Sequence, residues 1–262
     1  MKVLSIFLSA LFPVFMYAED TFEYSPDRPG CTTGTNVLPQ WKVGWETGLA
    51  YEHNRRNGSN EKTWTINTST IRIGVTPHAE LRLQMDECTT HSPDGNSHGI
   101  ANAMIGTKIR IFEGQGWVPQ ISYLGNLLIP GGRKADYLPS HPGAQMHLLF
   151  SNTINRLFSL GYDIGAEWSG ESNSPDLFFG ACINLMINSK LTLFAESYNY
   201  YNGSKQDEWA KPQKASHFNW MSEWGAAYML SPKLQLDLYT DVNFNEPSKY
   251  FNIGIGVAWL IN

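Results

Sequence analysis

The chain has 262 residues and a formal net charge of −5, with 13% aromatic and 16% charged residues. Charged residues make up about 25% of a typical soluble protein, so this chain either buries an unusual core or presents apolar side chains to lipid. The negative net charge argues against nucleic acid as a partner, because binding to phosphates needs a basic surface.

The first residues have the order of a secretory signal peptide: a charged start, an apolar run from Val3 to Phe15 and a polar exit after Ala18. The alternative is a membrane-spanning helix, which needs about 20 apolar residues. This run is shorter and contains Pro13. We therefore expect residues 1–18 to be a signal peptide. The cleavage position stays open, because Met16 is larger than the residue usually found three positions before a cut.

Residues 19–39 are predicted to lack regular structure, because they contain Pro26, Pro29, Gly30, Gly34 and Pro39. About twenty extended residues are long enough to reach well into a barrel. Two interpretations stay open. The segment is a plug in the lumen, with Asp27 and Arg28 meeting charges on the wall, or it is a tail in the periplasm.

From Trp41 to the end, apolar and polar residues alternate over stretches of about ten residues, which is the period of a two-faced β-strand. In the last stretch, Phe251, Ile253 and Ile255 lie on one face and Asn252 and Gly254 on the other. The stretch at 63–76 is the weakest, because its parity slips between Ile66 and Ile71, which a bulge or a late strand start would explain. Strands are expected at 41–53, 63–76, 79–88, 100–112, 117–129, 143–154, 158–169, 176–188, 190–201, 216–230, 234–245 and 251–262.

The predicted connections alternate in length along the whole chain. Short turns at 76–79, 113–116, 155–156, 188–190 and 231–233 alternate with longer polar links at 54–62, 89–99, 130–142, 170–175, 202–215 and 245–249. This alternation is typical of a barrel with one end in the periplasm and the other outside the cell. An even number of strands places both termini at the periplasmic end.

These patterns predict an all-β fold over residues 40–262: a transmembrane antiparallel up-and-down β-barrel of about 12 strands, with its oily face turned toward lipid. A soluble sandwich or lipocalin-like barrel would turn that face inward. Within hydrocarbon, a sheet must close on itself to satisfy its backbone. Aromatic residues near the strand ends suit two interfacial girdles, at Trp45, Tyr51, Trp168, Trp220, Trp224, Tyr228 and Trp259.

Several segments resemble the outer-membrane transporter family of the meta-pathway of phenol degradation: 27–29, 46–52, 148–153, 160–168 and 230–237. The resemblance covers nearly the whole mature chain, and none of these motifs is catalytic. It implies an outer-membrane channel or transporter for small solutes, such as aromatic or other small organic compounds. It does not identify the solute.

Charges on the polar face are the candidate pore lining, and they divide by strand. Arg72, Arg82, Lys108 and Arg110 lie on one wall of the predicted ring, and Asp163, Glu167, Glu196, Glu223, Asp237 and Asp241 on the opposite wall. Glu46, Glu52, Glu80 and Asp86 are mixed in on the basic side. Opposed charges would create a field across a water-filled passage. Alternatively, they pair with one another across a narrow lumen. Twelve strands fall between filled eight-stranded barrels and open channels of sixteen or more.

Two other functions, a hydrolase and a structural or adhesive barrel, are alternatives to a channel. An outer-membrane lipid-modifying hydrolase needs a base within hydrogen-bond reach of its nucleophile. His147 and Ser151 share strand parity but stand four residues apart, so we expect no catalysis. A non-conducting structural or adhesive barrel would use the polar loop at 202–215. The expected partners are the bilayer and a small solute, no cofactor is implied, and the oligomeric state stays open.

The three cysteines, Cys31, Cys88 and Cys182, lie far apart in the sequence. They form no Cys-x-x-Cys pair and the histidines are not clustered, so no metal site is expected. The periplasm permits one disulfide, for which Cys31 and Cys88 are the candidate pair.

Overall fold

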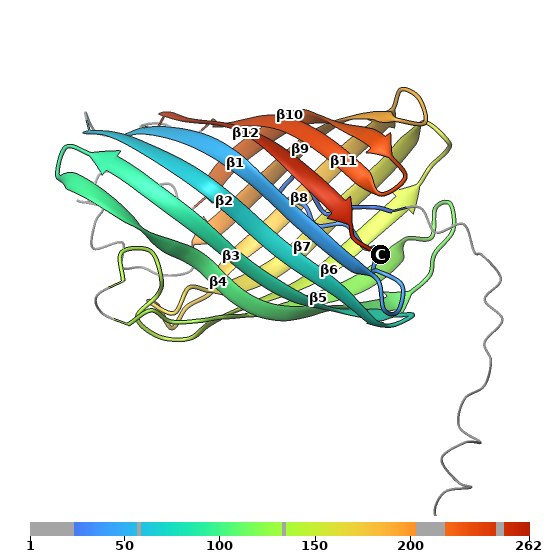
Figure 1. Ribbon diagram of the computed structural model, residues 1–262, viewed down its shortest axis with the longest axis horizontal. Helices are drawn as coiled ribbons and strands as arrows, with labels where there is room; N and C mark the ends of the chain where they lie inside the picture. Colours follow the sequence, from blue (N-terminus) through green and yellow to red (C-terminus); the bar gives the residue numbers. More distant parts are fainter. Residues whose placement is uncertain (1–23, 57–58, 133–134, 203–217, 245–248) are drawn as a thin grey trace, which may run out of the picture.

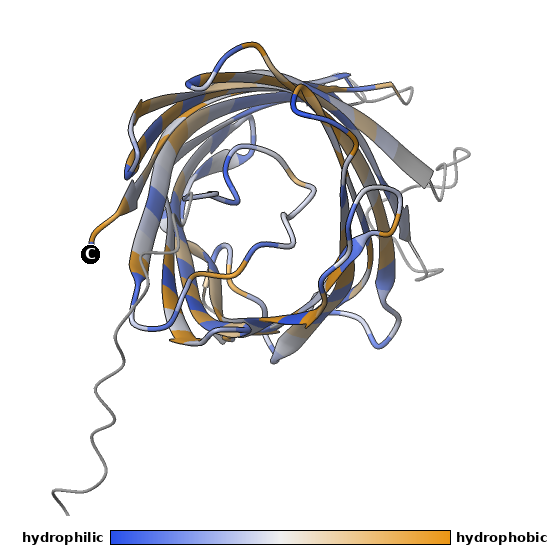
Figure 2. Cartoon of the chain, turned by 90° about the vertical axis from the view of Figure 1, so that its right-hand side faces the viewer, coloured by the Kyte–Doolittle hydropathy of each residue, from blue (hydrophilic) through white to orange (hydrophobic). Residues whose placement is uncertain are grey.

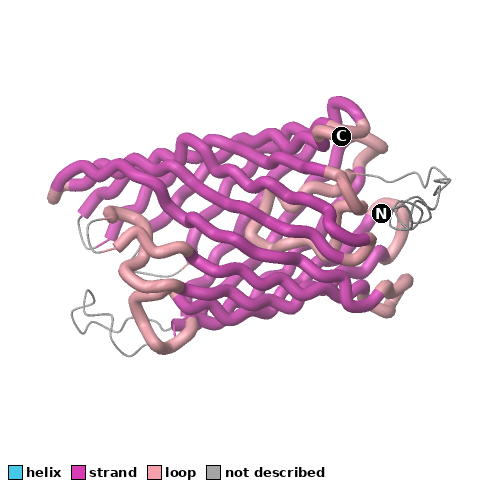
Figure 3. The backbone as a smooth tube through the Cα atoms, turned by 60° about the horizontal axis from the view of Figure 1, so that its bottom comes forward, coloured by secondary structure: helices cyan, strands magenta, loops and turns pink. Residues whose placement is uncertain are grey.

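The computed structural model describes residues 24–56, 59–132, 135–202, 218–244 and 249–262 (Figure 1). The expected signal peptide, residues 1–18, lies outside these ranges, as does most of the loop at 202–215. The described residues form twelve strands and no helix (Figure 3). No helix long and apolar enough to cross a membrane occurs among them.

The strands follow one another along the chain with short or medium connections. Their bounds are β1 Val43–Arg56, β2 Ser59–Thr76, β3 Ala79–Ser92, β4 Gly95–Phe112, β5 Gln120–Leu128, β6 Gly143–Thr153, β7 Phe158–Trp168, β8 Asp176–Met186, β9 Leu191–Asn202, β10 Phe218–Ser231, β11 Leu234–Asn243 and β12 Lys249–Leu260. Each pairs antiparallel with the next, and β1 pairs with β12 to close the ring. The predicted fold class, an up-and-down barrel of twelve strands, is confirmed.

The largest differences from the predicted strands are two longer hairpins. The links expected at 54–62 and 89–99 are largely paired backbone, because β1 continues to Arg56, β2 starts at Ser59, and only two residues separate β3 from β4. The alternation of apolar and polar residues in the sequence marks only the part of a strand that faces hydrocarbon. Beyond that band the backbone continues to pair while the side chains become polar. The parity slip in β2 is a bulge, because its register with β3 shifts between Thr65 and Asn67.

Hydrophobic and hydrophilic residues alternate along the strands, as the colours in Figure 2 show. The exposures of the side chains place the apolar ones on the outer face. Ile255 is 53% exposed and Leu238 is 50% exposed, whereas Glu46 and Arg72 on neighbouring strands are buried. The face that a soluble barrel would bury is therefore the outer face here. The aromatic residues Trp45 and Trp259, which are register partners on β1 and β12, also lie on this surface.

This orientation predicts a different cost for charge on each face. Ile255 lies on the outer face, midway along β12, and pairs with Leu49 on one side and Leu238 on the other. Ile255→Lys is expected to destabilise the barrel by about 2–4 kcal/mol in a bilayer, the usual cost of a lipid-facing lysine near the midplane. Reversible urea unfolding in lipid vesicles measures it, with Ile255→Val as the control. A cost near zero for the lysine variant would mean that this face does not contact lipid.

Candidate functional site: the lumen and its inner segment

Residues 24–40, called the inner segment from here on, run inside the barrel (Figure 2). At one end, Tyr24 and Leu38 pack against Ala258 and Leu260 of β12, and all four are buried. Farther along, the hydroxyl of Thr35 lies 2.6 Å from that of Ser151 on β6. The segment therefore contacts strands on opposite sides of the ring.

Asp27 of the inner segment meets the basic wall. Lys108 Nζ lies 2.8 Å from both carboxylate oxygens of Asp27, and Arg82 forms an ion pair with the same group. Arg72 Nη1 is 3.6 Å from Asp27 Oδ2. Three of the four basic residues predicted on β2 to β4 thus converge on one carboxylate. Arg110 does not join them, because its guanidinium pairs at 2.6 Å with Glu113, which follows the end of β4.

Two wall carboxylates complete this cluster. Arg72 Nε lies 2.9 Å from Glu80 Oε1, and Arg72 Nη1 lies 2.9 Å from Glu46 Oε1. Glu46 also accepts hydrogen bonds from the backbone amides of Asp27 and Arg28, at 3.2 Å each. The cluster therefore holds three cations and three carboxylates, of which the inner segment supplies one. Removing one partner of such a buried network leaves uncompensated charge, which is strongly destabilising.

The cations determine the ionisation of Asp27. Burial alone would raise the pKa of this carboxyl, but Arg72, Lys108 and Arg82 outweigh it and hold the pKa well below its ordinary value of 3.8. A carboxyl whose pKa is lower in the folded than in the unfolded state stabilises the fold at every pH above its ordinary pKa. That contribution is lost only as the pH falls through the lowered value.

We therefore expect Asp27 to stay ionised when exposed carboxyls have already taken up protons. The measurement is carbon NMR of protein labelled at aspartate carboxyl carbons, with the Asp27 signal assigned by its absence from Asp27→Asn. Between pH 7 and pH 4 this signal should not shift. A midpoint at or above the ordinary value would show that Asp27 lacks its cationic neighbours.

Arg28, the next residue, lies against β11, β12, β1 and β2, beside the Asp27 cluster rather than across the ring from it. Its Nη2 lies 3.1 Å from Asp237 Oδ1, and its Nη1 donates to Thr68 Oγ1 at 2.8 Å. The guanidinium lies against Gly48 and Gly256, which are direct partners on β1 and β12. A Cβ at Gly48 would come within 2.5 Å of Arg28 Nη2, so this close approach requires glycine. Two adjacent residues of opposite charge thus contact adjoining parts of the ring, Asp27 on β2 to β4 and Arg28 on β11 to β2.

The other predicted acidic residues lie on the inner face with different partners. Glu196 accepts hydrogen bonds from the amides of Cys31 at 2.6 Å and Thr32 at 3.1 Å. Asp163 and Glu167 flank one residue that the predicted lining omitted, His147, at 2.9 and 3.2 Å from its two ring nitrogens. The remaining two, Glu223 and Asp241, are buried on the inner face of β10 and β11.

An aromatic group on the inner wall was also missed by the sequence analysis. Phe178, Tyr198 and Met221 are buried together, with Tyr200 and Tyr250 packed against them. Strand parity could have identified Tyr198 and Met221, because each shares a face with a predicted acidic residue of its own strand, Glu196 on β9 and Glu223 on β10. The composition gave no reason to separate them from lipid-facing aromatic residues.

The candidate disulfide between Cys31 and Cys88 is not formed, and all three cysteines are free. The amide of Cys31 is bound to Glu196 on β9, whereas Cys88 lies on β3 against Thr65. These strands stand on different sides of the barrel, which sequence separation cannot reveal. Burial, together with the carboxylates of Glu223 and Glu196, raises the pKa of the Cys31 thiol well above its ordinary value.

Two cavities open at opposite ends of the barrel. The first has a volume of about 480 Å³ and lies beside the longer connections, where Tyr137, Trp168, Gln145 and Glu167 are among its lining residues. The second, about 450 Å³, lies beside the turn between β4 and β5 and includes Ser151. Glu167 links the first cavity to His147, and Ser151 links the second to the inner segment.

Comparison with known proteins agrees with this architecture. The family described as the MetA-pathway of phenol degradation matches residues 26–261. The chain belongs to this family. The match includes most of the inner segment as well as all twelve strands, so the family pattern extends beyond the barrel wall. No curated protein matches the sequence.

Solved structures of outer-membrane barrels are similar to this family member. A crystal structure of an outer membrane channel from Pseudomonas putida F1 aligns with a TM-score of 0.63 at 13% identity, covering 91% of this chain and 100% of that one. The NanC porin aligns with a TM-score of 0.51 at 10% identity, covering 81% and 98%. The translocator domain of the autotransporter NalP from Neisseria meningitidis aligns at 0.50 and 14%, covering 86% and 89%. At these identities, the likeness establishes the fold.

Proposed function

We propose that this protein is an outer-membrane channel for small organic solutes, and that the inner segment is its plug. The passage would be lined by Arg72, Arg82, Lys108, Arg110, Asp163, Glu167, Glu196, Glu223, Asp237 and Asp241. Residues 1–18 would direct export, residues 19–39 would include the plug, and residues 40–262 would form the barrel.

The observation that carries this proposal is that the inner segment fills the lumen through polar and ionic contacts with several strands. Asp27 contacts Lys108 of β4, Arg28 contacts Asp237 of β11, and Thr35 contacts Ser151 of β6. Eight-stranded barrels fill their lumen with side chains of their own wall, and a barrel of twelve strands is wider. Here a separate chain segment occupies the space, held by polar and ionic contacts. Such contacts can be exchanged for water more readily than an apolar core, because charged groups regain hydration when they separate. A removable polar filling is the arrangement expected of a gated passage.

The aromatic group of the inner wall supports the class of solute. Phe178 contacts the rings of Tyr198 and Tyr200, with centroids 6.3 and 5.2 Å apart. His147, bound to Asp163, also approaches Phe178 at 5.4 Å. Ring faces beside charged and hydrogen-bonding groups suit a molecule with one flat apolar part and one polar part. A substituted aromatic compound has this chemistry, in keeping with the family's association with phenol degradation.

Conductance in planar lipid bilayers tests the channel. We expect discrete current steps from the purified protein, changed in size or ion selectivity by Arg82→Ala and by Asp237→Ala. Vesicle-swelling assays with hydroxylated aromatic acids and with sugars of similar mass then test the solute class, and the aromatic compounds should enter faster. A folded barrel that gives neither current nor swelling would instead support the structural or adhesive alternative.

A lipid-modifying hydrolase has less support in the geometry. The two ring nitrogens of His147 contact Asp163 and Glu167, and the hydroxyl of Ser151 contacts Thr35. The base that such an enzyme would need is thus engaged with carboxylates rather than with a serine hydroxyl. We therefore propose a non-catalytic role.

A further inference from the structure

A row of three carboxylates crosses adjacent strands on the inner wall. Glu196 of β9 stands directly opposite Glu223 of β10, and Glu223 stands directly opposite Asp241 of β11. All three are at least 97% buried, with exposures of 3%, 2% and 2%. Like charges directly opposite each other destabilise a sheet, so this row needs positive charge nearby.

Among the described residues, no cation forms an ion pair with Glu223. Its Oε1 is buried without a hydrogen-bond partner in the part of the chain that the structure describes. Arg28, the cation of the inner segment, is engaged with Asp237 instead. A buried carboxylate oxygen without a donor is unusual in a folded protein and calls for an explanation such as an ion or a water molecule.

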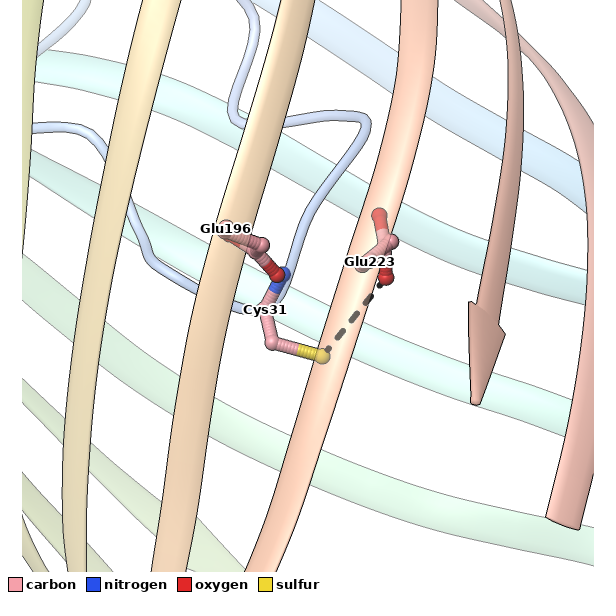
Figure 4. Close-up of side chains that lie close together, drawn as sticks. All are labelled: Cys31, Glu196 and Glu223. Carbon is pink, nitrogen blue, oxygen red and sulfur yellow. Dashed lines mark hydrogen bonds between the residues drawn. The ribbon is translucent and has the colours of Figure 1, made fainter. Parts of the chain in front are cut away.

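The inner segment adds a thiol at this position. Figure 4 shows Cys31 between Glu196 and Glu223, with its Sγ 4.0 Å from Glu223 Oε2. The sulfur and one oxygen of each glutamate lie within 4.8 Å of one another. Around one zinc ion, with bonds of about 2.3 Å to sulfur and 2.0–2.2 Å to oxygen, such atoms stand roughly 3.5 Å apart. Small side-chain rotations would close this triangle.

We propose that Cys31, Glu196 and Glu223 bind one thiophilic divalent cation of the zinc type. One sulfur and two carboxylate oxygens suit Zn²⁺, whereas Ca²⁺ and Mg²⁺ prefer ligand sets made of oxygen alone. On binding, the thiol loses its proton to solvent, and the two carboxylates and the thiolate share the ion's two positive charges. The ion would fasten the inner segment to β9 and β10, at a distance from the Asp27 cluster on β2 to β4.

The test is a titration of the purified protein in detergent, after removal of metals with a chelator, using Zn²⁺ alone in competition with a chromophoric chelator. Co²⁺ or Cd²⁺ then reports the thiolate through its charge-transfer absorption. We expect one ion per chain and a thiolate band. Cys31→Ser and Glu223→Gln should each weaken binding by more than the roughly 10- to 100-fold that loss of an outer-sphere partner costs.

Two matched controls each remove a group of the same kind, a thiol or a carboxylate, from β3. Cys88→Ser removes the buried thiol of β3, and Asp86→Asn removes a buried carboxylate that is bound to Asn102. Both should bind Zn²⁺ as the parent does. Glu223→Gln also removes charge repulsion, so a folded variant is expected. Absence of binding in the parent, or binding unchanged in both site variants, would overturn the proposal. Neither readout depends on conductance, so the result stands apart from the channel proposal.

Discussion

Deletion of residues 24–38 is expected to raise the single-channel conductance severalfold. The inner segment occupies the lumen, where Asp27 pairs with the basic residues of β2 to β4 and Arg28 pairs with Asp237 of β11. Without the segment, water fills the lumen and hydrates the charged side chains of the wall. The barrel itself should persist, because its closure depends on pairing between β1 and β12 rather than on the segment. Conductance of the deleted and full-length chains in the same planar bilayer measures the effect.

The control for this deletion is a folding check on both proteins. Heat-modifiable mobility in gels and the strand signal in circular dichroism should be equal for the two chains. Equal conductance of two folded barrels would show that the segment does not limit the passage. A second control adds a synthetic peptide of residues 24–38 to the deleted barrel, which is expected to reduce the current again.

Asp27→Ala is expected to release the inner segment without any deletion. The substitution leaves Arg72, Arg82 and Lys108 with one carboxylate fewer, and loss of a partner from a buried ion pair costs about 3–5 kcal/mol. Since each 1.4 kcal/mol is a factor of ten, the released population should rise by about two to three orders of magnitude. Cys31 reports this release through its rate of modification by a membrane-impermeant maleimide, in a Cys88→Ser, Cys182→Ser background.

Asp94→Ala is the matched control, because Asp94 is an exposed carboxylate in the turn between β3 and β4. It removes the same charge without touching the lumen and should leave the modification rate of Cys31 unchanged. If Asp27→Ala and Asp94→Ala gave the same rate, Asp27 would not hold the segment in place.

Most of the barrel could be predicted because hydrocarbon imposes a strict pattern on a strand. Ile253 and Ile255 must face lipid, so the residues between them face the lumen, and the same reasoning placed Arg72, Lys108 and Glu196 on the inner face. The pattern ends where the strand leaves the bilayer. For this reason, the outer parts of β1 to β4 were predicted as loops, although their backbones are paired.

The contents of the lumen could be predicted only in part. Proline and glycine indicated that residues 19–39 are irregular, and the opposite charges of Asp27 and Arg28 suggested wall partners. Which wall each residue meets depends on the path of the segment inside the ring, and no local pattern encodes that path. The same limit left the Cys31–Cys88 disulfide an open possibility, since the path of the inner segment places Cys31 beside Glu223 of β10 instead.

A disulfide between cysteines introduced at Thr35 and Ser151 tests most directly whether the inner segment lies within the barrel. The hydroxyl oxygens of Thr35 and Ser151 lie 2.6 Å apart, so cysteines at both positions would place their sulfur atoms within bonding reach after slight adjustment. In a background without native cysteines, Thr35→Cys with Ser151→Cys should oxidise readily to an intramolecular disulfide. Thr35→Cys with Leu148→Cys, which lies on the outer face of the same strand, should remain reduced. Equal oxidation of both pairs, or of neither, would contradict a segment held inside the lumen.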